Sequence, residues 1–209
     1  MSAPPRVAAR LRSTTDGPLD VVHAGPDAVY VDLDGVCLGV VSARASQVPC
    51  ALRSRLPSLP RPRVVVVRDG SLHLDEMALV VGRLASVTVP RVDLAPAPLR
   101  AAAGDLVGAG AGLTPYGDDI LCGWLALNRA AGVATPQVDQ EIRALLPRTS
   151  LLSATLLECA MHGEVVPEFA AYLTALGTPD EAAATAALTA VGASSGEGLL
   201  QGARWALAA

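Results

Sequence analysis

The fold of this 209-residue chain is decided by one segment, Gly108-Ala-Gly-Ala-Gly-Leu-Thr-Pro-Tyr-Gly-Asp-Asp119. Its glycines permit positive φ angles and a close approach of the backbone to a ligand. Thr114 and Pro115 are typical of an N-cap followed by the first residue of a helix. Residues 120–127 are apolar on every side, which is typical of a helix buried in the middle of a domain. The segment therefore predicts a flexible polar loop that leads directly into a buried helix.

Two well-known glycine-rich loops do not match this segment. A Walker-type phosphate loop requires a lysine after its last glycine, and the chain contains no lysine. The dinucleotide-binding fingerprint requires a third glycine where this chain has Leu113 or Pro115. Without lysine, a Schiff base with pyridoxal phosphate is also excluded. We therefore expect neither NAD nor pyridoxal phosphate, and the simplest structural alternative is a tight connection between two helices.

The composition favours one large or two small globular domains. Hydrophobic residues make up 51% of the chain and aromatic residues 3%, which predicts a core of Ala, Val and Leu. The net charge of -4 provides no basic surface for nucleic acid. The sequence shows neither an apolar run of roughly twenty residues, as a membrane span requires, nor a secretion signal. We therefore expect a cytoplasmic protein that binds neither nucleic acid nor membrane.

The four cysteines and three histidines are dispersed along the chain. They lack the paired spacing of a zinc site, so no zinc is expected. Cys122 and Cys159 lie within apolar helical patterns and are predicted to be small core residues.

Residues 1–95 are predicted to form a β-rich domain. Asp34-Gly35 and Asp69-Gly70 each separate two apolar runs, which is typical of a hairpin. The pattern predicts an antiparallel barrel or sandwich of short strands. The expected strands lie within 28–41, 63–74, 77–81 and 86–92.

Residues 96–209 are predicted to form an all-helical bundle, which makes the whole chain α+β. The border is the Pro-rich segment 95–98, and capping signals recur after it. The expected helices are 99–107, 120–131, 135–147, 149–162, 167–176, 178–192 and 194–209.

Three of the expected helix starts carry hydroxyls and free backbone N–H groups, and such starts attract anions. If they meet, they form a pocket for a phosphate or carboxylate, with Arg148 supplying positive charge. The alternative is that each Ser or Thr only caps its own helix. The predicted substrate-binding residues are Gly108, Gly110, Gly112, Thr114, Tyr116, Gly117, Arg148, Thr149, Ser150, Ser194, Ser195 and Gly196.

Asp118 and Asp119 are the candidate catalytic and metal-binding residues. Adjacent helical residues point about 100° apart, so one carboxylate is expected to face the site while the other bonds N–H groups of the glycine loop. A carboxylate beside an anion would repel it, unless it holds a divalent cation such as Mg²⁺ or accepts a proton from the substrate. The structural alternative is a pair of acids that only stabilises the helix dipole.

Other polar residues are assigned ordinary roles. Glu158 and His162 lie four residues apart and match a general base with its orienter, but an exposed helical pair is the favoured interpretation. Asp32 and Asp34 are interpreted as turn residues rather than metal ligands.

Segment 108–119 resembles the signature of a bacterial family of largely unknown function. That family includes the AllH-type subunit of oxamate carbamoyltransferase, and its members were earlier labelled putative carboxylases. Segments 148–153 and 191–202 are also similar, in the family's order, so the resemblance covers most of residues 99–209. The family usually has Ser at the position of Tyr116, which implies either a different ligand or use of the phenol.

The resemblance implies a role in the last steps of allantoin and purine degradation. There, oxalurate and phosphate are exchanged for oxamate and carbamoyl phosphate, in concert with two other subunits. The leading hypothesis is thus a carbamoyl- or carboxyl-handling transferase, or a subunit of one, that binds phosphate, carbamoyl phosphate or an oxamate-like anion. Positioning and charge stabilisation would then drive catalysis. The alternative is a non-catalytic subunit that binds a metabolite or assembles a complex.

Overall fold

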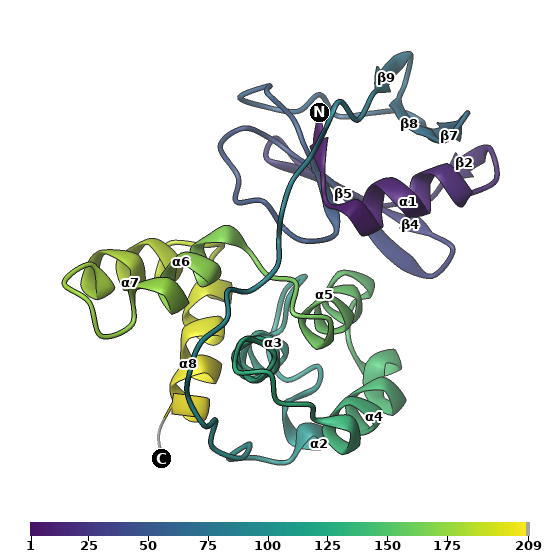
Figure 1. Ribbon diagram of the computed structural model, residues 1–209. Coiled ribbons are helices and arrows are strands. Elements are labelled where there is room, and N and C mark those ends of the chain that lie inside the picture. Colours follow the sequence, from purple (N-terminus) through teal and green to yellow (C-terminus); the bar gives the residue numbers. More distant parts are fainter. Residues whose placement is uncertain (208–209) are drawn as a thin grey trace. The chain divides into compact units, whose positions relative to one another are not determined.

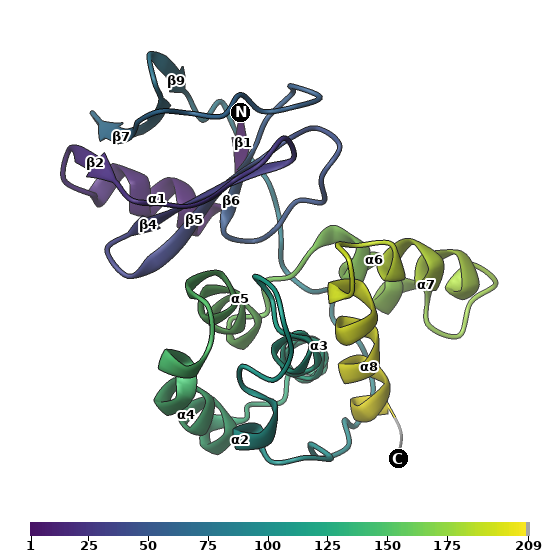
Figure 2. The same cartoon turned by 180° about the vertical axis from the view of Figure 1, so that it is seen from behind.

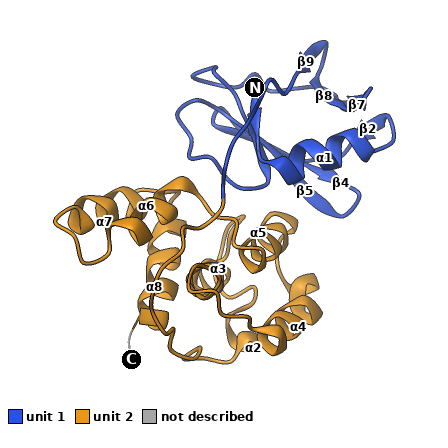
Figure 3. Cartoon of the chain, viewed as in Figure 1, with its two compact units in different colours: residues 1–87 blue, residues 88–209 orange. Residues whose placement is uncertain are grey.

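A computed structural model describes residues 1–207 of the chain. The chain divides into two compact units, Met1–Val87 and Thr88–Ala209 (Figure 1 and Figure 3). In the described residues, all strands belong to the first unit and most helices to the second. The predicted α+β class, with sheets first and helices second, is therefore confirmed.

The first unit contains two sheets. Their strands are β1 (Ser2–Ala3), β2 (Gly17–Leu19), β3 (Val21–Ala24), β4 (Ala28–Leu33), β5 (Val36–Val41), β6 (Ala51–Arg53), β7 (Val65–Arg68), β8 (Ser71–Leu74), β9 (Met77–Leu79) and β10 (Arg83–Leu84). One sheet has the order β10-β1-β6-β5-β4-β3, and the other has the order β2-β7-β8-β9. The described strands thus form two sheets and no closed barrel. Two pairs, β1 with β10 and β5 with β6, are parallel, so the pairing is not wholly antiparallel as predicted.

Both Asp-Gly pairs form the predicted hairpins. Strand β4 pairs antiparallel with β5, and β7 pairs antiparallel with β8. The φ angles are 53° and 77° at Asp34 and Gly35, and 48° and 69° at Asp69 and Gly70. Two consecutive residues with positive φ match the twist of the flanking strands, which explains why the sequence signal is reliable.

The first unit also contains a helix, α1 (Pro5–Ser13), in the half predicted to be mainly strand. Pro5 occupies the first turn, and the buried residues Val7, Ala8 and Leu11 lie on one face. These side chains join one core with residues from both sheets. The β-rich run 86–92 forms no strand, and its ladder contact is a single bridge between Thr88 and Glu164.

The second unit is helical, and each predicted helix is present, with residues 208–209 of the predicted helix 194–209 lying outside the described residues. The helices are α2 (Ala103–Leu106), α3 (Tyr116–Ala130), α4 (Pro136–Leu145), α5 (Leu151–Met161), α6 (Pro167–Ala175), α7 (Glu181–Thr189) and α8 (Ser195–Leu207). Helix α3 is central and packs against α2, α5 and α8 (Figure 1 and Figure 2). Cys122 and Cys159 are both buried, as predicted. None of the helices in residues 1–207 has the length and apolar character needed to cross a membrane.

Helices α3 and α8 pack against each other through glycines. A Cβ atom on Gly123 would collide with the carbonyl oxygen of Leu199, and one on Gly202 would collide with that of Ile120. A Cβ atom on Gly198 would lie 2.5 Å from Cβ of Asp119. The two helix backbones therefore touch where α3 and α8 cross, and the Gly198 contact joins the first turns of the two helices.

Candidate functional site

The glycine-rich loop packs closely against neighbouring backbone segments because its glycines lack side chains. Gly108 and Gly110 have φ angles of 76° and 123°. A Cβ atom on Gly108 would lie 2.5 Å from the carbonyl oxygen of Arg148, and one on Gly110 would lie 2.7 Å from the backbone nitrogen of Tyr116. A Cβ atom on Gly112 would meet open space, although its φ of 95° still favours glycine. The loop is therefore a fixed structure between the preceding helix and α3, while residues 109–113 are exposed.

Helix α3 begins at Tyr116, one residue after the start predicted from Thr114 and Pro115 and four residues before the expected range 120–131. Pro115 is the N-cap and Tyr116 is the first helical residue, so the prediction of Thr114 as the cap is wrong. The Thr114 hydroxyl instead forms a 2.8 Å hydrogen bond with the Ser195 hydroxyl, in which either can donate. This bond joins the start of α3 to the start of α8. Gly117 fits tightly, because a Cβ atom there would collide with the carbonyl oxygen of Leu106.

Asp118 is fully buried and its carboxylate is fully engaged. Oδ1 accepts a 2.8 Å hydrogen bond from the Gly108 backbone N–H. Oδ2 accepts hydrogen bonds from the Thr149 hydroxyl and from the Ser153 hydroxyl, the latter at 2.7 Å. One of the two acids thus bonds the loop backbone, as the sequence indicated, and it also ties the loop to the start of α5. Ser153 was not among the predicted site residues, although it lies in the first turn of α5, three residues after the cap Ser150.

Asp119 has the opposite environment. Its side chain is 4% exposed, and Oδ2 is buried without a hydrogen-bond partner. Burial raises the pKa of Asp119 to about 7, a hydrogen bond from Ser195 opposes the rise, and the charge of Asp118 adds to it. A buried carboxyl oxygen without a partner is rare in proteins and points to a functional role.

The start of α5 also contacts the loop. The Ser150 hydroxyl accepts a 3.0 Å hydrogen bond from the Ser153 backbone N–H and so caps the helix. The same hydroxyl donates to the Leu113 carbonyl oxygen in the glycine loop. Ser150 is therefore a helix cap, as the structural alternative predicted, and it also contacts the loop.

The remaining predicted residues lie around the same point. Ser195 begins α8, and the Ser194 carbonyl oxygen accepts a 3.0 Å hydrogen bond from the Gly198 backbone N–H. Gly196 is a packing residue, because a Cβ atom there would collide with the Leu188 carbonyl oxygen. Arg148 is exposed and contacts the loop through its backbone carbonyl. The structure thus brings the starts of α3, α5 and α8 together.

Glu158, His162 and Asp32 have ordinary structural roles. Glu158 accepts two hydrogen bonds from the Arg143 guanidinium, at 2.8 Å and 3.1 Å. His162 is exposed at the C-terminal end of α5. Asp32 accepts a 2.7 Å hydrogen bond from the Gly35 backbone N–H and is a turn residue.

A metal site is not apparent from side-chain clustering. Within residues 1–207, no three His, Cys, Asp or Glu side chains gather as ligands. Because Asp118 already accepts three hydrogen bonds, Asp119 is the member of the pair with an oxygen free for a further ligand.

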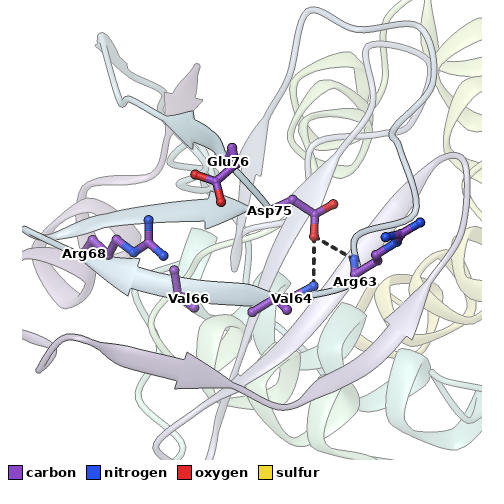
Figure 4. A pocket seen from close by; sticks show the side chains of 6 residues that line it. All are labelled: Arg63, Val64, Val66, Arg68, Asp75 and Glu76. Atoms are coloured by element: carbon purple, nitrogen blue, oxygen red, sulfur yellow. Dashed lines mark hydrogen bonds between the residues drawn. The ribbon is translucent and has the colours of Figure 1, made fainter.

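The first unit has a cleft of about 450 Å³ along β7 and the turn between β8 and β9 (Figure 4). It is lined by Arg63, Val64, Val66, Arg68, Asp75 and Glu76. Asp75 Oδ1 accepts hydrogen bonds from the backbone N–H groups of Arg63 and Val64, at 2.9 Å and 3.0 Å. None of the predicted site residues lies in this cleft.

The helical unit thus defines a class of domain in which three helix starts meet at a glycine-rich loop beside two buried aspartates. Residues 106–207 match the family model described as oxamate carbamoyltransferase subunit AllH. The match includes every predicted site residue and confirms the resemblance that the sequence showed. Comparisons with curated proteins and with solved structures found no match.

Proposed function

We propose that the helical unit binds a small anion and serves in a carbamoyltransferase-type enzyme together with other subunits. The family description names a subunit of such an enzyme. The observation that carries the proposal is the contrast between Asp118, whose carboxylate is saturated with hydrogen bonds, and Asp119, which has a buried oxygen without a partner.

The anion is held by backbone N–H groups at the exposed glycine loop and at the adjoining helix starts. The N-terminal end of a helix carries partial positive charge and free N–H groups, which suit phosphate or carboxylate oxygens. Arg148 is exposed next to the loop and provides the formal positive charge. Asp118 keeps the loop and the start of α5 in register.

Asp119 transfers the proton. A group with a pKa of about 7 is about half neutral at pH 7, so its repulsion of an anion is reduced. In its neutral form the carboxyl can donate a proton, and in its charged form it can accept one. The pKa thus suits reversible transfer near neutral pH.

The proposed reaction has a simple proton balance. A phosphate oxygen attacks the carbamoyl carbon of the ureido substrate, and the bond from that carbon to the leaving nitrogen breaks. The nitrogen takes a proton from neutral Asp119, and the proton that the attacking hydrogen phosphate loses restores this carboxyl as carbamoyl phosphate is formed. In the reverse direction the carboxylate accepts a proton from the attacking nitrogen.

A Mg²⁺ ion also suits the site. Mg²⁺ is often held by one or two carboxylates together with phosphate oxygens of the substrate. Asp119 Oδ2 would be its protein ligand, and the ion would neutralise phosphate charge.

The replacement Asp119→Asn tests the proposal in the complex reconstituted with its partner subunits. We expect the folded structure to persist and turnover to fall by about 10²- to 10⁴-fold, the usual contribution of a general acid or base. The control is Asp180→Asn, which changes an exposed carboxylate at the start of α7 without a side-chain capping bond. Unchanged turnover of the Asp119 variant would instead support the non-catalytic subunit.

A further inference from the structure

Tyr116 lies in a slot formed by two glycines. It is the first residue of α3, and its side chain is 38% exposed. On one side, a Cβ atom added to Gly110 would lie 3.4 Å from Cβ of Tyr116. On the other side, a Cβ atom added to Gly198 would lie 3.4 Å from Cδ2 of the ring. The absence of a side chain on Gly198 therefore leaves room for this ring, and its absence on Gly110 leaves room for the backbone and Cβ of Tyr116.

Tyr116 and Asp119 lie on the same side of α3. Residues three apart on a helix are neighbours, and both approach Gly198 of α8, with Asp119 Cβ 2.5 Å from the position of a Gly198 Cβ atom. Asp119 is 4% exposed and Tyr116 is 38% exposed, so the phenol lies nearer the solvent than the carboxyl does. An unpartnered carboxyl oxygen of Asp119 is buried behind it.

To bind an anion, the site also needs hydrogen-bond donors that extend away from the loop. Near the loop, the Thr114 and Ser195 hydroxyls bond each other, and the Thr149 and Ser150 hydroxyls are donated to Asp118 and to Leu113. A tyrosine hydroxyl is a donor at neutral pH, and its rigid ring loses little conformational entropy on binding.

We propose that Tyr116 contacts the ligand and determines specificity. Its hydroxyl donates a hydrogen bond to the bound anion at the mouth of the site. This inference rests on the proposed function, because it assumes that an anion binds between the glycine loop and the start of α8. The phenol supplies a neutral hydrogen-bond donor on the side of the ligand that faces solvent. The backbone N–H groups of the loop do not reach that side of the ligand.

The test is the affinity of the full-length protein for phosphate, measured by isothermal titration calorimetry in wild type and in Tyr116→Phe. This replacement removes only the hydroxyl and keeps the ring in its slot. A lost hydrogen bond to a charged group is expected to weaken binding by at least about tenfold. The midpoint of unfolding should stay unchanged. If the hydroxyl had only a structural role, its removal would change that midpoint instead.

The matched control is Tyr172→Phe, which makes the same chemical change at a buried tyrosine of α6 in the same unit. Its affinity for phosphate should equal that of the wild type. If the wild type binds phosphate and Tyr116→Phe binds it equally well, the role of Tyr116 is wrong while the proposed function stands. If the wild type binds neither phosphate nor carbamoyl phosphate, the proposed function itself is contradicted.

Discussion

At the scale of single residues, the site depends on two neighbouring aspartates that share a helix turn but not an environment. Asp118 accepts hydrogen bonds from the loop and from two hydroxyls near the start of α5, whereas Asp119 keeps a buried oxygen without a partner. The angle between adjacent helical residues predicted this division from the sequence. Which of the two acids takes which role depends on tertiary contacts, so the sequence left it open.

Asp118→Asn should destabilise the protein. The amide retains one acceptor oxygen and places an NH₂ donor where an oxygen accepted hydrogen bonds from Gly108, Thr149 or Ser153. The buried mismatch is expected to lower the free energy of unfolding by about 2–4 kcal/mol. Denaturant unfolding measures this, with Asp119→Asn as the comparison, because that change breaks fewer bonds. Equal losses in the two variants would contradict the structural role given to Asp118.

The stability should fall as the pH rises through neutrality. The pKa of Asp119 is about 7 in the folded protein and near its ordinary value of 3.8 when unfolded, so between these values the folded state binds more protons. The stabilisation is complete below about pH 4 and is lost as the pH rises through 7, by an amount on the order of a few kcal/mol. Unfolding at pH 5 and pH 8 should show a stability decrease in wild type that is largely missing in Asp119→Asn. The same pH dependence of stability in both proteins would contradict the contribution assigned to Asp119.

At the scale of elements, the close packing of α3 and α8 positions the site. Glycines at the crossing let the backbones approach, which brings Thr114 to Ser195 across 81 residues of sequence. The local signature Thr114-Pro115 predicted a cap because nothing in the neighbouring sequence reveals this distant partner. By contrast, Asp34-Gly35 and Asp69-Gly70 were predicted correctly, since hairpin turns are determined by their own backbone angles.

Gly202→Ala should force α3 and α8 apart. Its new Cβ atom would collide with the Ile120 carbonyl oxygen, and overpacking of this kind costs about 1–3 kcal/mol of stability. The control is Gly104→Ala in α2, where the nearest atom to the new Cβ lies 3.9 Å away and φ is ordinary. That variant should be neutral or slightly stabilising, since alanine favours helix. If thermal unfolding of the two variants coincides, the account of the helix crossing is wrong.

At the scale of the whole molecule, the sequence predicted the order of sheet and helix and most helix positions. It did not predict α1, nor the parallel pairs β1–β10 and β5–β6, because strand partners far apart in sequence leave no local pattern. The family match covers residues 106–207 and so concerns the helical unit alone. The account therefore assigns anion binding to that unit and not to the cleft along β7.

The most direct measurement of this claim is a phosphate titration of the full chain followed by backbone amide NMR. The account predicts saturable shifts at the amides of Gly108–Leu113 and in the first turns of α3, α5 and α8. Absence of any saturable shift, or shifts that gather instead around Arg63 and Arg68 in the cleft of the first unit, would contradict it.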